Sequence, residues 1–289
     1  MSSRRVERFA PSPTGPLHLG HAFSALTAAR GADRFLLRME DIDTARSRPD
    51  WEAAIEQDLH WLDLDWERPV LRQSERLPLY RDAVARLTAA GLTYACTCTR
   101  GDIRAALSAP QEGAPVTGPD GLVYPGTCRR AGHPEEANAI RLDMAAAIAA
   151  LGGDEAVRRL TFTELDEGPE GQTGCIPLDP DALRTGVGDI VLARRDIGTS
   201  YHVAVVVDDA AQAITHVTRG RDLFEATPIH RILQALLDLP TPLYRHHRLI
   251  RDADGKRLAK RDDARALSLL RAQGWTPADI RRAIGLSDS

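Results

Sequence analysis

The stretch FAPSPTGPLHLGH, residues 9–21, most constrains what this chain can fold into. It follows a short strand-like run, RRVERFAP, and it leads into LHLGHAFSALTAARGA, where apolar residues recur at helical spacing. Prolines and Gly15 keep the connecting turn free of bulky side chains. A strand that passes through such a turn into a helix is the repeating unit of α/β proteins.

The alternation of strand and helix continues as far as Gly91. RFLLRMED indicates a second strand, and RPDWEAAIEQDLHWLDL indicates an amphipathic helix with Asp50 as its expected cap. The apolar residues expected on the inner face of that helix are Trp51, Ile55, Leu59 and Leu62. ERLPLYRDAVARLTAAG indicates a further helix that ends at Gly91. The order strand, helix, strand, helix, helix predicts a parallel α/β layout.

The pattern changes in the middle of the chain. Residues 109–135 are rich in Pro and Gly, so we expect an insertion of loops and short strands that runs to about Asp189. The α/β rhythm then returns in helix-like SYHVAVVVDDAAQ, strand-like AITHVTRG and helical IHRILQALLDL. After Pro242 we expect a loop and short helices.

Composition excludes several classes of protein. The chain has 289 residues, of which 43% are hydrophobic and 27% charged, as in an ordinary globular protein with a sizeable core. No apolar run approaches the ~18 residues of a membrane span, and the N-terminus has no apolar signal region. We therefore expect a cytoplasmic protein with no membrane partner. The net charge of −4 gives no overall basic field, but residues 245–271 form a local basic patch that could hold a phosphate backbone.

His18 and His21 are the first candidates for chemistry. They lie three residues apart in the first turn of the expected helix, with Gly20 between them. The free N–H groups and the dipole of a helix N-terminus suit phosphate, and two histidines there could donate to a phosphate in a transition state. Gly20 would let a flat base lie against the backbone. The alternative is that one histidine caps the helix and the other packs against it.

Four ordered motifs carry a resemblance to a known family. RFAPSPTGPLHLGH resembles the signature of class I aminoacyl-tRNA synthetases in the form used by the glutamate enzymes, and LLRMEDIDTARSRP, YHVAVVVDD with ITHVTRG, and GKRLAKRD follow in the family's order. The resemblance spans roughly residues 5–262. It implies a Rossmann-like catalytic domain that binds ATP, with Mg2+, and that activates L-glutamate as glutamyl-adenylate.

The resemblance also implies a division of the chain into domains. Residues 1–95 and 189–242 would be the two halves of the catalytic domain. Residues 96–188 would be an insertion with a zinc site and an acceptor-type subdomain. Residues 243–289 would hold the signature loop and a short helical region.

A glutamate site needs cations for two carboxylates and an anion for one ammonium. Arg8, at the end of the first strand-like run, and Arg219, after ITHVT, carry guanidinium groups that suit carboxylates. Glu40 could take the ammonium, and Tyr201 could add a hydroxyl contact. Ligands of open α/β sheets lie at the carboxyl ends of the strands, near which all three charged residues fall. The resemblance implies the same positions, together with Ala10 and Ser12. Taken singly, each residue could equally be an ordinary surface group.

The lysines are informative because Lys256 and Lys260 are the only two in the chain. The family's signature loop is Lys-Leu-Ser-Lys-like, and in register this chain has Arg257, Leu258, Ala259 and Lys260. The resemblance implies that Lys260 reaches the phosphates of ATP as the adenylate forms, which suits a compact charge on a flexible stem. Lys256 lies one residue out of register and is the candidate to replace the missing first lysine.

Cys96, Cys98 and Cys128 form a cluster that predicts a structural zinc site. A closed zinc site wants four ligands, and Tyr124, His133 and water are the candidates for the fourth, with imidazole the commoner ligand. CTC followed by YPGTC, however, resembles the truncated glutamyl-tRNA synthetase relatives that modify queuosine in tRNA(Asp), which implies Tyr124. The alternative is a metal-free cluster of buried thiols.

The length of the chain supports the same subfamily. Only 29 residues follow Lys260, too few to form an anticodon-binding domain, since chains below ~40 residues rarely fold alone. We therefore expect a monomer that activates glutamate without tRNA and transfers it to queuosine at the anticodon of tRNA(Asp). Two alternatives are a truncated synthetase that charges a tRNA 3′ end and a non-catalytic tRNA-binding module.

Overall fold

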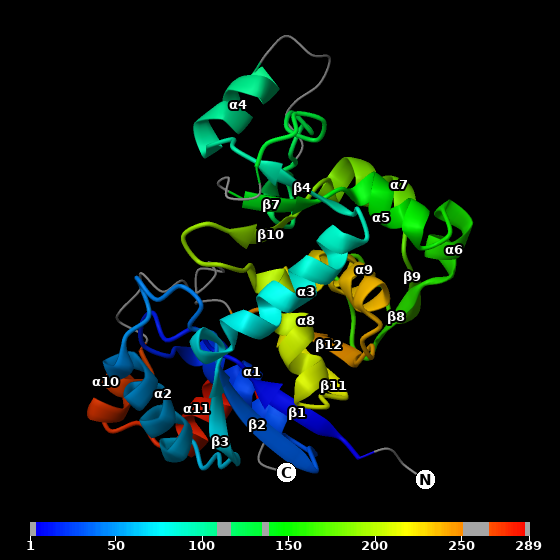
Figure 1. Cartoon of the computed structure of the whole chain (residues 1–289). Helices are drawn as coiled ribbons and strands as arrows, with labels where there is room; N and C mark the ends of the chain where they lie inside the picture. Colours follow the sequence, from blue (N-terminus) through cyan, green and yellow to red (C-terminus); the bar gives the residue numbers. More distant parts are fainter. Residues whose placement is uncertain (1–3, 109–116, 135–138, 251–265, 287–289) are drawn as a thin grey trace.

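Two sets of parallel strands meet at the centre of the molecule. The computed structural model describes residues 4–108, 117–134, 139–250 and 266–286. In the first set, β1 (Val6–Phe9), β2 (Arg34–Met39) and β3 (Glu67–Arg72) pair in that order, all parallel. In the second, β11 (His216–Gly220), β12 (Leu243–His247) and β8 (Thr161–Glu164) are parallel, and β9 (Gly174–Pro177) is antiparallel at the edge. The Thr215 N–H donates to the Val6 carbonyl at 3.1 Å, so β1 lies beside β11 (Figure 1).

Helices cover both faces of these strands, which gives the doubly wound arrangement. One apolar core packs residues of α3 (Leu77–Ala89), α8 (Tyr201–Ala211) and α9 (Thr227–Leu237) against one face. A second core packs α1 (Leu19–Ala29), α2 (Pro49–Trp61), α10 (Leu267–Ala272) and α11 (Pro277–Ala283) against the other (Figure 1). The predicted parallel α/β layout is confirmed. None of the described helices has the length and apolar character needed to cross a membrane.

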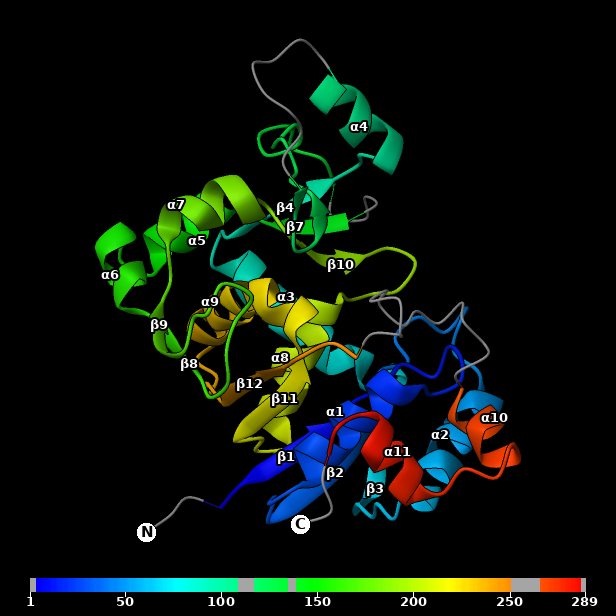
Figure 2. The same cartoon turned by 180° about the vertical axis from the view of Figure 1, so that it is seen from behind.

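The insertion is built on a three-stranded antiparallel sheet in the order β10 (Val191–Arg194), β7 (Ala139–Leu142), β4 (Thr93–Cys96). A short hairpin, β5 (Thr117–Gly118) with β6 (Gly121–Leu122), lies within it. The other elements of this part of the chain are α4 (Arg100–Ser108), α5 (Met144–Ala150), α6 (Asp154–Arg159), α7 (Pro180–Ala182) and the π-helix η2 (Leu183–Val187). Part of the insertion, with α4, β4 and β7, lies at the top of Figures 1 and 2, while buried residues of β7, α5, α6 and β10 belong to the first core.

The insertion differs from the expected run of loops and short strands. It contains helices, and its strand β8 belongs to the main sheet beside β12. β4 and β10 also pair with β7 across the expected boundaries at residues 95 and 189. The insertion is therefore connected to the catalytic layers by shared strands as well as by the chain. The four expected domains stay a prediction.

Three local expectations are wrong, each for a physical reason. β3 was not expected, because this edge strand carries charged, exposed residues in place of an apolar pattern. β12 was expected to be loop, because it buries two histidines rather than aliphatic side chains. Asp50 does not cap α2: the cap is Arg48, and Pro49 fixes the first helical residue, which leaves Asp50 inside the first turn.

Two 3-10 turns, η1 (Gln73–Arg76) and η3 (Arg221–Ala226), connect strands to the helices that follow. Within η1 and α3, three side chains converge on Asp208 of α8. The Arg76 guanidinium donates to Asp208 at 2.7 Å, the Tyr80 hydroxyl at 2.7 Å and the Gln73 amide at 3.0 Å. Asp208 is fully buried, so these bonds are what makes its charge tolerable there. They also fix α8 against α3.

We predict that Asp208→Ala lowers the free energy of unfolding by about 3–5 kcal/mol, because it leaves the Arg76 charge and two polar groups without their partner. Urea unfolding followed by circular dichroism measures the change. Asp82→Ala, an exposed aspartate on the same helix α3, is the matched control and should change stability by about 0.5 kcal/mol or less. Equal effects at the two positions would contradict the role given to Asp208.

Candidate active site and metal centre

The two histidines of the first motif form the N-terminus of α1. His18 is the N-cap residue: its Nδ1 accepts the Gly20 N–H at 3.1 Å, while its own backbone N–H donates to His21 Nδ1 at 3.2 Å. The two rings stack with their centroids 3.8 Å apart. Because each Nδ1 accepts a backbone N–H, each neutral ring carries its proton on Nε2. That tautomer is the one that can donate to a phosphate oxygen.

Gly20 is required by the close approach of the His18 ring. A Cβ added at Gly20 would lie 3.0 Å from His18 Cε1 and 3.1 Å from Nδ1, closer than such atoms normally come. Capping and chemistry are therefore not alternatives at this helix end, because the ring of His18 caps the helix and is oriented by doing so.

Four of the residues expected to bind glutamate influence one another electrostatically. Burial raises the pKa of the Tyr201 hydroxyl; Arg219 and Arg8 act to lower that pKa, and Glu40 acts to raise it. Contacts link the same side chains: Asp209 and Arg38 connect Arg8 to Glu40, and His230 contacts both Arg219 and the ring of Tyr201. The four residues come from β1, the end of β2, the start of α8 and β11, so the fold brings together what the sequence separates.

Arg8 and Glu40 already have partners within the protein. The Arg8 Nε donates to Asp209 Oδ1 at 3.0 Å, and Arg38 Nη1 donates to the same oxygen at 2.8 Å. Burial would raise the pKa of the Asp209 carboxyl, but the two arginines outweigh it and hold that pKa below its ordinary value. Glu40 lies 3.5 Å from Arg38, and burial raises its pKa. Asp209 and Arg38 were missed, although two adjacent acids in the otherwise apolar helix YHVAVVVDD could have indicated a buried role.

Ala10 and Ser12 lie in the turn between β1 and α1, where both are partly buried. The Glu40 N–H donates to the Pro11 carbonyl at 3.0 Å, so this turn is tied to the end of β2. The two residues therefore lie beside the charged group. Lys256 and Lys260 are outside the described residues.

Arg219 has a different environment from Arg8. Its three nitrogens contact His246, His230 and Thr227, all of them uncharged acceptors, and the ring of His246 contacts Glu164 on its other side. Sequence reasoning missed these partners. The signal available was weak, since histidines and a threonine rarely stand out in a sequence.

The three predicted cysteines form a compact cluster. The sulfur atoms of Cys96, Cys98 and Cys128 all lie within 4.8 Å of one another, and Cys96 and Cys128 are buried. The Tyr124 hydroxyl lies 3.4 Å from the sulfurs of both Cys96 and Cys98, and it accepts the Cys128 N–H at 2.9 Å. One phenol oxygen among three thiols is a donor set that fits a tetrahedral metal ion.

His133 is not part of this cluster. Its Nε2 lies 3.3 Å from the Thr97 hydroxyl. Burial would raise the pKa of the Cys128 thiol, but hydrogen bonds with Tyr124, Thr97 and Cys98 lower it to about 6, which favours a thiolate at neutral pH. Cys175, on the edge strand β9, is exposed and lies away from the cluster.

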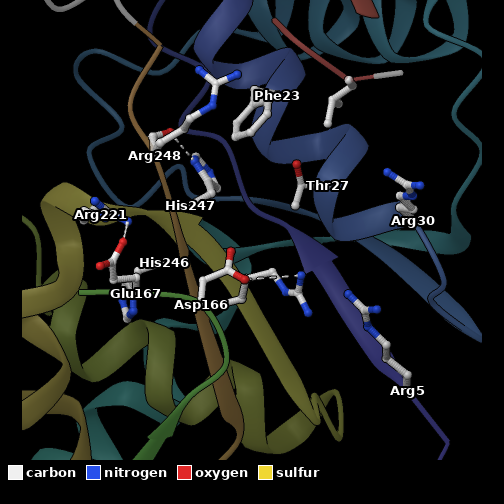
Figure 3. A pocket seen from close by; sticks show the side chains of 12 residues that line it. Arg5, Phe23, Thr27, Arg30, Asp166, Glu167, Arg221, His246, His247 and Arg248 are labelled. Carbon is white, nitrogen blue, oxygen red and sulfur yellow. Dashed lines mark hydrogen bonds and ion pairs between the residues drawn. The ribbon is translucent and has the colours of Figure 1, made fainter. Parts of the chain in front are cut away.

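A cavity of about 670 Å³ lies between α1, β12 and the loop after β8 (Figure 3). Phe23 and Thr27 of α1 form one wall, and His246 and His247 lie across from them (Figure 3). Five arginines and two acids complete most of the lining: Arg5, Arg30, Arg221, Arg245, Arg248, Asp166 and Glu167. None of the residues predicted to bind glutamate lines this cavity. A second cavity of about 700 Å³ borders the loop after β2 and includes Pro13 and Asp41.

Comparisons with known proteins agree with this geometry. The pattern of the family "tRNA synthetases class I (E and Q), catalytic domain" matches residues 5–287. A glutamyl-Q tRNA(Asp) synthetase from Rhodobacter capsulatus is 59% identical, over 97% of this chain and 100% of the relative. Relatives of the same name from Symbiobacterium thermophilum and Nocardia farcinica are 44% and 41% identical; each match covers 94% of this chain, and 83% and 81% of the relatives.

Solved structures show the same likeness. Glutamate-tRNA synthetase from Elizabethkingia anophelis matches with a TM-score of 0.68 and 26% identity over 91% of this chain. A glutamate tRNA ligase from Elizabethkingia meningosepticum, solved in complex with its amino acid, matches with a TM-score of 0.66 and 26% identity. The matched region is 54% and 53% of those chains, so this chain spans about half of their length. On this evidence the chain belongs to the glutamyl-Q tRNA(Asp) synthetases, a family of class I synthetases with ligase activity.

Proposed function

We propose that this protein activates L-glutamate with ATP as glutamyl-adenylate, in the absence of tRNA, and transfers glutamate to the queuosine base at the anticodon of tRNA(Asp). The observation that carries the proposal is the convergence of Arg8, Glu40, Tyr201 and Arg219 at one end of the parallel strands. Two cations, one anion and one hydroxyl match the two carboxylates and the ammonium of glutamate. The names of the relatives supply the acceptor.

In this site the two arginines have different tasks. Arg219 has no carboxylate partner among the described residues and offers its charge to a substrate carboxylate. Arg8 shares Asp209 with Arg38, so its remaining donors serve the second carboxylate. Glu40 receives the ammonium, and Ala10 and Ser12 line the turn beside it.

ATP lies at the N-terminus of α1 in this proposal. His18 and His21 donate through Nε2 to the phosphate that glutamate attacks. The adenine base lies against the backbone at Gly20, which carries no side chain. Mg2+ accompanies the phosphates. Lys260, outside the described residues, adds its ammonium as the adenylate forms. The carboxylate oxygen of glutamate bonds to the α-phosphorus, and pyrophosphate leaves.

One structural Zn2+ is held by Cys96, Cys98, Cys128 and Tyr124. The sulfurs and the phenol oxygen lie in one cluster between the end of β4 and the segment after β6, so the metal would join these two parts of the insertion. It takes no part in the chemistry of activation.

We propose that the protein acts as a monomer in the cytoplasm. The two alternatives, charging of a tRNA 3′ end and tRNA binding without catalysis, use the same fold and differ in the reaction measured.

We predict pyrophosphate exchange into ATP that depends on glutamate and needs no tRNA. The physical reason is that every group assigned to activation belongs to this chain, so none has to be supplied by tRNA. The exchange is measured with glutamate, with glutamine and with neither, each in the presence and absence of tRNA. Exchange that requires tRNA would contradict the proposed mode of activation, and no exchange under any condition would favour the non-catalytic alternative.

We predict that His21→Ala slows adenylate formation by ~10²–10³, the effect of losing one positioned donor to developing phosphate charge. At His18 the helix cap must be separated from the chemistry, so the variant is His18→Asn, because asparagine also caps well. Pre-steady-state adenylate formation is compared with the melting temperature. His60→Ala, a histidine on α2, is the control. Rates within a few-fold of wild type, with the fold retained, would leave both histidines as structural residues.

We predict one zinc per chain by elemental analysis of the purified protein. Tyr124→Phe should weaken metal retention during dialysis against a chelator, because the phenol oxygen that completes the four ligands is removed. His133→Ala should retain zinc as well as wild type does. The reverse result would make His133 the fourth ligand, and metal-free protein of full stability would contradict the zinc site.

A further inference from the structure

Arg219 is a buried cation whose partners are all neutral. Arg219 lies in β11, next to the last residue of the strand, and is 5% exposed. Its Nε donates to His246 Nε2 at 2.9 Å, its Nη2 donates to the Thr227 hydroxyl at 2.8 Å, and its Nη1 lies 3.1 Å from His230 Nδ1. None of the ion pairs among the described residues includes Arg219. A buried charge normally lies against an opposite charge, so this arrangement requires an explanation.

Glu164 fixes the tautomer of His246, so that Nε2 is free to accept a hydrogen bond from Arg219. The carboxylate of Glu164 lies 2.5 Å from His246 Nδ1, and it also accepts the backbone N–H of His246 at 2.9 Å and of Asp166 at 3.1 Å. A carboxylate with these contacts only accepts, so Nδ1 carries the ring proton and Nε2 presents a lone pair. Burial lowers the pKa of His246 to about 4, although the contact with Glu164 acts to raise it. The ring is therefore neutral, and its Nε2 accepts from Arg219.

The tautomer of His230, the second imidazole that contacts Arg219, is also fixed by its neighbours. Its Nδ1 accepts from Arg219, so its Nε2 carries the proton and faces His202 Nδ1 at 3.1 Å. Burial, helped by the charge of Arg219, lowers the pKa of His230 well below its ordinary value. Arg219 thus has two imidazole acceptors of fixed tautomer, and the Glu164 carboxylate lies behind one of them.

The consequence is a guanidinium that is held in place but not neutralised by direct contact. Three of the five N–H groups of a guanidinium are used, one on each nitrogen, which leaves one on each terminal nitrogen for a bidentate carboxylate. Arg8 provides the contrast, because it lies directly against Asp209.

We propose that His246 and Glu164 are positioning residues that hold Arg219 as an unpaired fork for a carboxylate of the substrate. The inference rests on the proposed function, in which Arg219 binds glutamate. An arginine already paired with a protein carboxylate would attract an acid and an amide almost equally. An arginine held by neutral rings prefers the acid, so this pair of residues favours glutamate over glutamine when Arg219 receives the side-chain carboxylate.

The first test changes the acceptor. His246→Phe keeps a buried ring but removes Nε2, and we expect glutamate to bind roughly ten- to hundredfold more weakly, the scale of a lost hydrogen bond to a charged group. Glutamate binding is measured by calorimetry without ATP, and the KM values for glutamate and ATP by pyrophosphate exchange. The KM for ATP should change little. His246→Gln, which places an amide oxygen near the position of Nε2, should restore part of the affinity.

The second test changes the tautomer with almost no change of shape. In Glu164→Gln the amide oxygen accepts the two backbone N–H groups, so its NH2 faces His246 Nδ1 and moves the ring proton to Nε2. That proton then opposes the Arg219 N–H, and we expect a loss of glutamate affinity close to that of His246→Phe. His247→Phe, a buried histidine next along β12, is the matched control and should bind glutamate like wild type.

The variant Arg219→Ala distinguishes a failure of the positioning role of His246 and Glu164 from a failure of the proposed glutamate site. If Arg219→Ala loses glutamate binding while folded His246→Phe and Glu164→Gln bind it like wild type, the positioning role is wrong and the proposed function stands. If Arg219→Ala itself binds glutamate normally, the glutamate assignment fails with it. Melting temperatures of all variants are recorded. Should His246→Phe not fold, the near-isosteric Glu164→Gln decides the question.

Discussion

Charge buried at the carboxyl ends of β1, β2 and β11 is the constraint on which the rest of this structure depends. Arg8, Arg38 and Arg219 are each 5% exposed or less, and removing such groups from water costs several kcal/mol apiece. Asp209 offsets the first two through bonds of 3.0 and 2.8 Å. α8 must therefore be held firmly, and the adjacent Asp208 does this by binding α3 and η1. Asp208 thus fixes the position of α8, and its neighbour Asp209 uses that position to balance the charges of Arg8 and Arg38.

At the N-terminus of α1, one side chain likewise serves both the fold and the candidate site. His18 caps the helix through Nδ1, and that bond places the ring proton on Nε2. Residue 20 must be glycine because the ring of His18 lies so close that a Cβ there would be 3.0 Å from His18 Cε1. A helix end that satisfies its own N–H groups with imidazoles presents Nε2 donors of defined tautomer, in addition to the helix dipole.

Sequence reasoning succeeded where a signal is local and failed where it is not. Apolar periodicity placed α1, α8 and α9, but β12 buries histidines and gave no strand pattern. Arg219 was found because it lies near the end of a strand-like run. Glu164 was missed because it lies 82 residues from His246, and only the pairing of β8 with β12 brings the two together. Residue spacing also could not decide between Tyr124 and His133 as the fourth zinc ligand, because the choice depends on how the chain folds back to the cysteines.

The transfer of glutamate to its acceptor tests the central claim most directly. The protein is incubated with ATP, labelled glutamate and purified queuosine-containing tRNA(Asp), and the tRNA is then digested to nucleosides and separated. We expect the label to elute with the queuosine nucleoside and the 3′-terminal adenosine to carry none. Label on the terminal adenosine, or glutamate that is activated but reaches no nucleoside of this tRNA, would contradict the proposed transfer.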